Sequence, residues 1–463
     1  MVITRTDRFS FSLYHFFLSL CMNTILVLGA GRSSSSLIHY LLDEAARRNW
    51  KVIVGDTAIA AAQQRIQNHT HGVAIAFDIN NQADAASIIA NADVVISLLP
   101  ATLHPLVAAI CLASNKHLLT ASYVSDEMLA YHEEAKQKGL LFLNECGLDP
   151  GIDHMSAIQV IDKIRNSGGK LISFESFTGG LIAPETDREN PWRYKFTWNP
   201  RNVVMAGQST AKYLQHGQFK YIPYQQLFQR TTPVQVSGYG DYEGYANRDS
   251  LKYINTYQLN GIETMLRGTL RNKGYCAAWN ILVQLGCCDD SYAMENVSEM
   301  THADFMASFT DGVSENVASW LAHRFSVTSN GPELERLNWS GLFSTEPVGL
   351  DHGTPAQILE HILNKKWKLN PDDKDLIVMW HRFVYKVGDQ VKEIQASLVA
   401  KGDDAVFTAM AKTVGLPLGI AATLLLEGKI KSRGVVIPVD KEIYDPVLER
   451  LKAFDIVLEE KEM

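Results

Sequence analysis

The chain has 463 residues, a length that favours two or three domains over a single core. Its 46% apolar and 20% charged residues are typical of a soluble globular protein. A formal net charge of −8, with no run of lysine and arginine, argues against a nucleic-acid-binding surface. The six cysteines form no CxxC pair, so we expect reduced thiols in a cytoplasmic protein.

The first 21 residues end in the apolar stretch "FSFSLYHFFLSLC", which has the composition of a signal peptide. A predicted strand begins directly after it, at about Asn23, so there is no space for a cleavage site and mature chain before the fold. The stretch is also too short to span a bilayer. We therefore expect translation to start at Met22, or residues 1–22 to be an N-terminal extension, and we expect no membrane association.

Between Asn23 and Gly147, continuous apolar runs alternate with segments of helical spacing. Buried strands that alternate with helices predict an α/β domain with a parallel sheet covered on both faces. The predicted strands are residues 24–31, 51–56, 74–78, 92–100, 117–122 and 140–147. The predicted helices are residues 35–49, 57–69, 81–91, 103–115 and 125–138.

The pattern changes after Pro150. Residues 168–184 read as a strand and loop, and residues 374–402 read as a long antiparallel hairpin around "VGD". Between the two, residues 264–365 show mostly helical spacing and few strand features. Two helices are expected at the end of the chain, at residues 404–428 and 442–454.

The turn after the first strand, "GAGRSSSS", resembles a dinucleotide-binding turn that lacks its third glycine. Gly29 would allow the tight turn, Gly31 would let a pyrophosphate approach the backbone, and Ser34 is small enough for the third position. The following helix would offer N–H groups and a positive dipole end to phosphate. A plain strand–turn–helix without a ligand is the alternative.

Asp56 ends the second strand, 25 positions after Gly31. A carboxylate there can hydrogen-bond the ribose hydroxyls and would repel a 2′-phosphate, which favours NAD over NADP. It would also serve as a helix N-cap, together with Thr57. Both roles are compatible.

Polar or special residues gather where the predicted strands end, which is where ligands bind in open α/β sheets. Asp149 stands at one such end; it is a candidate proton relay, but Asp149 followed by Pro150 also fits a helix N-cap with proline in the first turn. Tyr123 is a second candidate proton donor, unless it only packs. The residues at these ends are Gly29–Ser33, Asp56–Thr57, Asp78–Ile79, Leu99–Pro100, Ser122–Tyr123 and Glu145–Asp149.

Two arginines further along stand among glycines and aromatics, in "GYANRDSLKY" and "LRGTLRNKGY". Arg248 and Arg271, expected on loops, could each bind a carboxylate through two parallel hydrogen bonds, although a surface salt bridge is the usual role of an arginine. His154 is expected to be structural. No arrangement such as HExxH suggests a metal site.

Several longer segments resemble saccharopine dehydrogenase of the glutamate-forming type, also known as saccharopine reductase. The resemblance runs in order from about Asn23 to near the C-terminus, and residues 1–22 lie outside it. It is carried by "ISLLPATLHPLV", "TASYVSDEM", "GLDPGIDHM", "GGLIAPE", "YKFTWNP", "GYANRDSLKY", "RGTLRNKGY" and "PVDKEIYDPVLERL".

The resemblance implies three parts and a homodimer. A Rossmann domain (23–149) is completed by C-terminal helices (403–463), a mixed α/β domain (150–263 and 366–402) binds substrate and dimerises, and a helical domain (264–365) is inserted. The implied reaction is saccharopine + NAD(P) + water to L-glutamate + 2-aminoadipate 6-semialdehyde + NAD(P)H, or its reverse, in lysine synthesis or breakdown.

The resemblance also implies a set of site residues. Asp149 and Tyr123 would exchange protons with the substrate. The residues implied to bind saccharopine are Ser122, Tyr123, Asp149, Arg248, Thr269, Leu270 and Arg271. The residues implied along the dinucleotide are Gly29, Ala30, Gly31, Arg32, Ser33, Asp56, Thr57, Asp78, Ile79, Leu99, Ser122, Leu148, Asp149, Pro150 and Asn199.

The chain departs from the family at one point of chemical interest. Members often carry a cysteine where this chain has Thr178, so a thiol proton carrier is absent there. Asp56 resembles the NAD-using type. Two other functions stay open: a carboxynorspermidine-type dehydrogenase, against which the full "GYANRDS" and "GTLR" segments argue, and a non-catalytic dinucleotide-binding protein.

Overall fold

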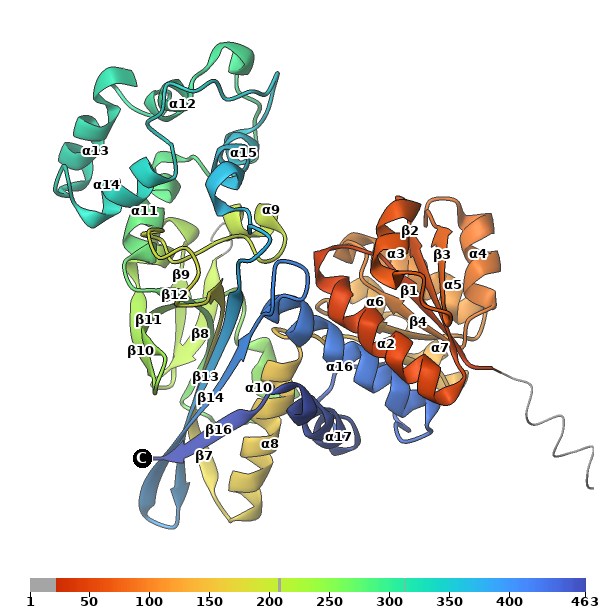
Figure 1. Cartoon of the computed structure of the whole chain (residues 1–463). Helices are drawn as coiled ribbons and strands as arrows, with labels where there is room; N and C mark the ends of the chain where they lie inside the picture. Colours follow the sequence, from red (N-terminus) through yellow and green to blue (C-terminus); the bar gives the residue numbers. More distant parts are fainter. Residues whose placement is uncertain (1–21, 207–209, 313) are drawn as a thin grey trace, which may run out of the picture. The chain divides into compact units, whose positions relative to one another are not determined.

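A computed structural model describes residues 22–206, 210–312 and 314–463 (Figure 1). The expectations for residues 1–21 lie outside the described residues. The chain forms two compact units, each described by itself: the first contains the chain up to Ile152 and Val414–Val447, and the second contains Asp153–Thr413 and Leu448–Met463.

The first unit is built on a parallel sheet of seven strands, counted over the described residues, in the order β15-β6-β5-β4-β1-β2-β3. Apolar runs such as "TILVL" supply strands whose side chains are buried on both faces, as the sequence predicts. The chain reverses direction across the sheet between β1 and β4, the position where α/β folds bind ligands. The strands are β1 (Thr24–Leu28), β2 (Lys51–Asp56), β3 (Gly72–Ala76), β4 (Val94–Ser97), β5 (His117–Thr120), β6 (Leu141–Leu143) and β15 (Gly434–Val436).

Helices lie on both faces of this sheet. The predicted helix over residues 125–138 is divided in two, because the chain turns at Ala130 and Tyr131. The helices of this unit are α2 (Ser35–Arg48), α3 (Ile59–Ile66), α4 (Gln82–Ala90), α5 (His104–Ala113), α6 (Asp126–Leu129) and α7 (His132–Gln137). Two further helices, α16 (Ala409–Leu426) and α17 (Lys441–Leu451), are divided between the two units, which meet in sequence after Thr413 and after Val447.

Helix α16 packs closely on α2 through two glycines. A Cβ placed on Gly415 would lie 2.9 Å from Leu37, and one on Gly419 would lie 2.6 Å from the ring of Tyr40. By length and composition α16 could cross a membrane, but 83% of it is buried in the structure, as in the core helix of a folded protein.

The second unit is built on a mixed sheet of nine strands, again counted over the described residues, with main order β10-β11-β12-β7-β13-β14-β16. Strands β7 and β12 run parallel, and the long β13–β14 hairpin is the one predicted around "VGD". The strands are β7 (Lys170–Ile182), β8 (Ala211–Gln215), β9 (Gln218–Ile222), β10 (Thr231–Val236), β11 (Gly240–Ala246), β12 (Thr264–Asn272), β13 (Asp375–Val387), β14 (Gln390–Lys401) and β16 (Leu458–Glu462).

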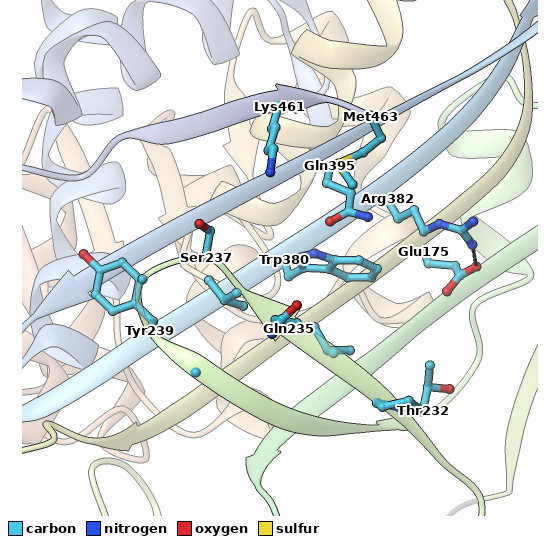
Figure 2. A pocket seen from close by; sticks show the side chains of 15 residues that line it. Glu175, Thr232, Gln235, Ser237, Tyr239, Trp380, Arg382, Gln395, Lys461 and Met463 are labelled. Atoms are coloured by element: carbon cyan, nitrogen blue, oxygen red, sulfur yellow. Dashed lines mark hydrogen bonds and ion pairs between the residues drawn. The ribbon is translucent and has the colours of Figure 1, made fainter.

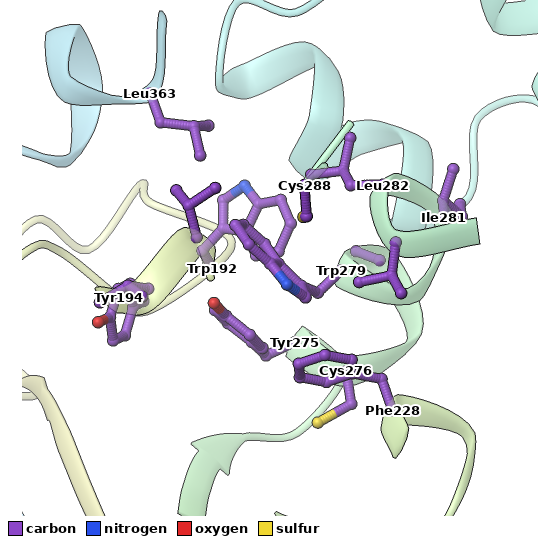
Figure 3. Packing of buried hydrophobic residues seen from close by; sticks show 14 of the residues in the cluster. Trp192, Tyr194, Phe228, Tyr275, Cys276, Trp279, Ile281, Leu282, Cys288 and Leu363 are labelled. Atoms are coloured by element: carbon purple, nitrogen blue, oxygen red, sulfur yellow. The ribbon is translucent and has the colours of Figure 1, made fainter. Parts of the chain in front are cut away.

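Most helices of this unit share a hydrophobic core that contains an aromatic cluster (Figure 3), whereas, over the described residues, α8 and α10 contribute no residue to it. Trp192, Tyr275, Trp279 and Trp367 meet there with ring centroids 5.1–6.3 Å apart. The helices are α8 (Ile152–Asn166), α9 (Pro200–Val204), α10 (Lys252–Thr256), α11 (Tyr275–Leu285), α12 (His302–Ala307), α13 (Val317–Phe325), α14 (Pro332–Trp339) and α15 (Pro355–Trp367).

The α/β fold class is confirmed, but two local predictions are wrong. Residues 264–272 are strand β12, not helix, and they pair with both β7 and β11. Arginines and a glycine interrupt the apolar pattern of this strand, which hid it. The end of the chain also differs from the prediction: strand β16 joins the second sheet beside β14 instead of completing the first unit.

The second sheet carries an open groove of about 750 Å³ (Figure 2). Trp380, Arg382 and Gln395 line it together with the β10–β11 turn. Among the described residues, none of the predicted substrate or dinucleotide residues lines this groove. This groove is therefore separate from the predicted substrate and dinucleotide residues.

Candidate functional site

The turn after β1 has the geometry that a dinucleotide requires. Gly29 has a φ of +100°, and a Cβ there would lie 3.1 Å from the carbonyl oxygen of Leu98, so no other residue fits without strain. A Cβ on Gly31 would meet no protein atom within 4 Å, which leaves open space beside the backbone. Ser34 is buried in the third glycine position, and its hydroxyl donates to the Gly31 carbonyl at 2.8 Å. These residues fit a pyrophosphate against the first turns of the helix.

Asp56 and Arg65 hold this turn from two sides. One carboxylate oxygen of Asp56 accepts the Ala30 N–H at 2.8 Å, and the other accepts the Ala58 N–H at 2.9 Å. Arg65 donates to the Gly31 carbonyl at 3.1 Å. Asp56 is not the N-cap of α3, which begins at Ile59 after Ala58. The carboxylate instead ties the end of β2 to the phosphate turn.

The remaining cofactor candidates of the first unit lie at the carboxyl ends of its strands, as predicted. Asp78 accepts the Asn80 N–H at 2.9 Å and so also closes a turn. Ile79, Leu148 and Pro150 are buried, Ser33 and Leu99 are half-buried, and Arg32 and Thr57 are exposed. Asn199 belongs to the second unit, where its side chain accepts the Arg201 N–H at 3.0 Å and caps α9.

Tyr123 and Asp149 meet at the carboxyl edge of the first sheet. The Tyr123 hydroxyl donates to a carboxylate oxygen of Asp149 at 3.2 Å. The helix-cap interpretation of Asp149 is wrong, because α8 begins only at Ile152. Asp149 instead lies in a tight turn closed by a hydrogen bond from Gly147 to the carbonyl of Pro150 at 2.9 Å. The pair is therefore a phenol–carboxylate couple presented by two loops.

Ser122, the neighbour of Tyr123, contacts a residue that the sequence analysis passed over. Its hydroxyl lies 2.8 Å from Nε2 of His104, which is 3% exposed at the start of α5. The reading of strand ends missed His104 because it follows β4 by several residues. Including the first residue of each following helix would have found it.

Arg271 is the most unusual side chain of the second unit. It lies on strand β12, not on a loop as expected, and is only 4% exposed. Among the described residues, no carboxylate lies within ion-pair distance of its guanidinium. Glu243 is paired with it on β11, but that carboxylate accepts the Cys276 N–H at 2.6 Å. Arg271 donates through Nη1 to the carbonyl of Leu270, and its Nε has no partner. Burying an unpaired charge is costly, so the arrangement favours an anionic ligand.

Three tyrosine rings surround this guanidinium. The rings of Tyr194, Tyr275 and Tyr245 lie 4.9, 5.2 and 5.8 Å from its Cζ. Figure 3 shows Tyr194 and Tyr275 within the aromatic cluster. Burial raises the pKa of Tyr194 to about 12, so its hydroxyl stays protonated as a donor. The indole of Trp198 lies near that hydroxyl but can only donate, which leaves the Tyr194 proton without an acceptor.

Two threonines add unpartnered donors to the second unit. Thr178, at the position of the family's cysteine, and Thr197 are both buried, and neither hydroxyl has a hydrogen-bond partner among the described residues. Thr178 pairs with Thr269 across β7 and β12. Tyr194 and Thr197 were not predicted as site residues; both lie in "YKFTWNP", a segment that contributed only to the family resemblance.

Arg248 and His154 have different surroundings. Arg248 is exposed on the loop after β11, where its carbonyl accepts the Lys212 N–H at 2.7 Å.

His154 is fully buried, and its Nδ1 lies 2.5 Å from the Tyr257 hydroxyl. It lies next to an ion pair between Asp153 and Arg267. The burial and contacts of His154 favour the structural role that was predicted for it. Over the described residues, no group of His, Cys, Asp and Glu is arranged to hold a metal.

Comparisons with known proteins agree with this geometry. Residues 25–143 match the model of the saccharopine dehydrogenase NADP binding domain, and residues 147–456 match that of the saccharopine dehydrogenase C-terminal domain. The chain belongs to the saccharopine dehydrogenase family. Its fold is that of the family: a dinucleotide-binding parallel sheet followed by a mixed-sheet domain.

Relatives within this family match over nearly the whole chain. The saccharopine dehydrogenase [NADP(+), L-glutamate-forming] of Schizosaccharomyces pombe is 32% identical over 95% of this chain and 99% of its own length. Rat mitochondrial alpha-aminoadipic semialdehyde synthase is 35% identical over 94% of this chain, which spans only 47% of that relative's length. The apo structure of the L-Glu-forming enzyme from Saccharomyces cerevisiae aligns with a TM-score of 0.86 at 30% identity, over 95% of this chain and 100% of that chain.

Proposed function

We propose that the chain is a saccharopine dehydrogenase of the L-glutamate-forming type. It would oxidise saccharopine with NAD(P) and water to L-glutamate and 2-aminoadipate 6-semialdehyde, or catalyse the reverse reduction. The observation that carries this proposal is the match to fungal enzymes of that name along almost the full length of both chains.

Groups in the second unit are suited to bind a substrate with several carboxylates. Saccharopine carries three, and the open Nε edge of Arg271 would bind one of them through two parallel hydrogen bonds. Tyr194 would add a third donor to the same anion, because its hydroxyl proton also lacks an acceptor. Arg248, on an exposed loop, would bind a second carboxylate.

The first unit supplies the acid–base groups. A bound dinucleotide would accept the hydride that leaves the ε-carbon of the lysine part, which converts the secondary amine to an imine. Asp149 and Tyr123, joined by their 3.2 Å hydrogen bond, would accept the amine proton and then assist the addition of water. Collapse of the resulting carbinolamine releases glutamate and the aldehyde. With Thr178 in place of the family's cysteine, no thiol at this position could carry a proton.

We propose NAD as the preferred dinucleotide. The Asp56 carboxylate lies at the end of β2 and is fixed there by two backbone N–H groups, where its charge would repel a 2′-phosphate. The fungal relatives named above are named for NADP(+), so this preference would separate the chain from them. Arg65, the cation nearest in sequence after Asp56, already donates to the turn carbonyls.

A steady-state assay tests the proposed reaction. NADH and NADPH formation is measured with saccharopine and, as the competing substrate class, with carboxynorspermidine. We expect turnover with saccharopine and a higher kcat/KM with NAD. Absence of turnover with saccharopine under either dinucleotide would contradict the proposal, and turnover with carboxynorspermidine alone would assign the chain to polyamine synthesis.

A further inference from the structure

His104 lies where two strands and a helix of the first unit meet. It is the first residue of α5, and its ring reaches the last residues of β4 and β5, Ser97 and Thr120, which pair directly across the sheet. This edge is the carboxyl edge, where a parallel sheet binds its ligands. The histidine is thus buried directly behind the candidate active site.

Both ring nitrogens of His104 have hydroxyl partners. Nδ1 lies 3.0 Å from Ser97 Oγ, and Nε2 lies 3.0 Å from Thr120 Oγ1 and 2.8 Å from Ser122 Oγ. The backbone N–H of Ser122 also donates to Thr120 Oγ1, at 3.3 Å. Ser97, Thr120 and His104 are buried, whereas Ser122 is half-buried. The network therefore has one end that a ligand can reach, and that end is Ser122.

The ring is neutral in this setting. Burial lowers the pKa of His104 from its usual 6.5 to about 4, and no charged group contributes to the shift. A neutral imidazole offers one N–H donor and one acceptor. In one tautomer Nε2–H donates to Ser122, and in the other the Ser122 hydroxyl donates to Nε2. Either way the hydroxyl has a partner on the ring, so its rotation is restricted.

We propose that His104 is a positioning residue that fixes the Ser122 hydroxyl toward the bound ligand. The inference rests on the proposed function, because Ser122 is assigned to saccharopine and the dinucleotide through that family's motif. A purely structural role would also link β4 to β5 and would also lower stability when lost. Only the positioning role acts through Ser122, and that difference can be measured.

A four-variant cycle measures it: wild type, His104→Leu, Ser122→Ala and the double variant. For each we measure kcat and KM with saccharopine, and Kd for NADH by fluorescence titration. Each single substitution should lower kcat/KM by about tenfold, the usual value of one hydrogen bond. The double variant should lose no more than about twofold beyond Ser122→Ala, because the two residues act as one. His104→Gln, which keeps a donor and an acceptor, should recover most of the activity.

His117 is a matched control in the same unit. It is also a histidine whose pKa burial lowers to about 4, but it lies at the opposite end of β5, where its Nδ1 accepts the Leu141 N–H at 2.9 Å. His117→Leu should lower the apparent Tm as His104→Leu does, leave kcat/KM near the wild-type value, and show no coupling to Ser122→Ala. Should His104→Leu fail to fold, His104→Asn takes its place, since its shorter amide cannot bridge Ser97 and Ser122.

Additive losses in the cycle, about a hundredfold in the double variant, would overturn the proposal, as would a His104→Gln variant as impaired as His104→Leu. If wild type does not oxidise saccharopine, the proposed function fails instead. The same cycle on the Kd for NADH then decides the role of His104 without the substrate: coupling supports it and additivity overturns it.

Discussion

The two units treat buried polar groups in opposite ways. In the first, the buried side chains of Ser97, His104 and Thr120 all have partners, and among the described residues only Ser36 and Asn144 bury a side-chain atom without one. In the second, the buried atoms without partners are mostly those around the predicted substrate residues or in the aromatic cluster. They include atoms of Thr178, Tyr194, Thr197, Arg271, Trp279 and Trp367.

The difference separates two ways of building a binding site. The first unit presents a finished surface, made of backbone at Gly31 and of side chains already fixed, which suits a cofactor bound in every turnover. The second unit buries donors without partners, which costs stability; under the proposed function these donors would bind carboxylates of the substrate. The cofactor site would thus be preorganised, whereas the substrate site would complete its hydrogen bonds only when the substrate binds.

The largest expected effect is on stability, and it distinguishes two buried arginines on the same strand. Arg267 and Arg271 are both buried on β12, but Arg267 is paired with Asp153 and Arg271 has no described carboxylate partner. Arg267→Met would remove the arginine from its buried ion pair with Asp153 and should cost about 3–5 kcal/mol. Arg271→Met removes a costly unpaired charge but also its contacts with three tyrosine rings, so the two effects should offset and stability should change by less than about 1 kcal/mol. The measurement is the apparent Tm of each variant, and equal losses would break the comparison.

Acid should affect the first unit more than the second. Burial lowers the pKa of His104 to about 4, so this side chain loses up to about 3 kcal/mol of stabilisation as pH falls from 6.5 to 4. In the second unit burial likewise lowers the pKa of His381 to about 4, but burial raises the pKa of Asp375 to about 6. Asp375 binds its proton more tightly when folded, so it gains stabilisation over a similar range and offsets His381.

Hydrogen exchange at pH 7 and pH 5 measures this difference. After correction for intrinsic rates, amides of β1 should lose more protection than amides of β13. The control is Asp375→Asn, which should make the second unit as sensitive to acid as the first. Equal loss of protection in the wild-type units would contradict the assignment of these protonation states.

The smallest effect concerns cofactor choice. Asp56→Asn removes the charge that would repel a 2′-phosphate and keeps an oxygen for the Ala30 N–H, so the NAD/NADP ratio of kcat/KM should move about tenfold toward NADP. Asp78→Asn, at the end of the neighbouring strand, should change both dinucleotides equally. An unchanged NAD/NADP ratio in Asp56→Asn would show that the Asp56 carboxylate only stabilises the phosphate turn and does not select the dinucleotide.

Sequence periodicity predicted six of the seven described strands of the first sheet, and it missed only the short strand β15. Runs such as "TILVL" and "VVIS" are buried on both faces, and their order along the chain predicts a parallel sheet. Strand β12 was missed because Arg267, Gly268 and Arg271 break the apolar run, and only the packed structure shows both arginines buried. The start of α8 was misplaced because the turn at Asp149 and Pro150 has the composition of a helix start.

The candidate site was predictable where it follows from one strand end. Gly29, Asp56, Tyr123 and Asp149 were found in this way. His104 and Tyr194 were not, because their significance depends on how the folded chain packs around them and not on a strand end. His104 acts across two adjacent strands, and the hydroxyl of Tyr194 is notable only because the folded unit offers it no acceptor. Local pattern finds backbone-built sites more readily than sites built by packing.

Isothermal titration calorimetry of saccharopine, with the dinucleotide present, tests most directly whether the substrate completes the second unit. Wild type and Arg271→Met are compared, with the apparent Tm showing that both are folded. If a substrate carboxylate is the missing partner of Arg271, the variant should bind saccharopine about a hundredfold more weakly, the value of a bidentate charged hydrogen bond. Equal affinities would contradict the account.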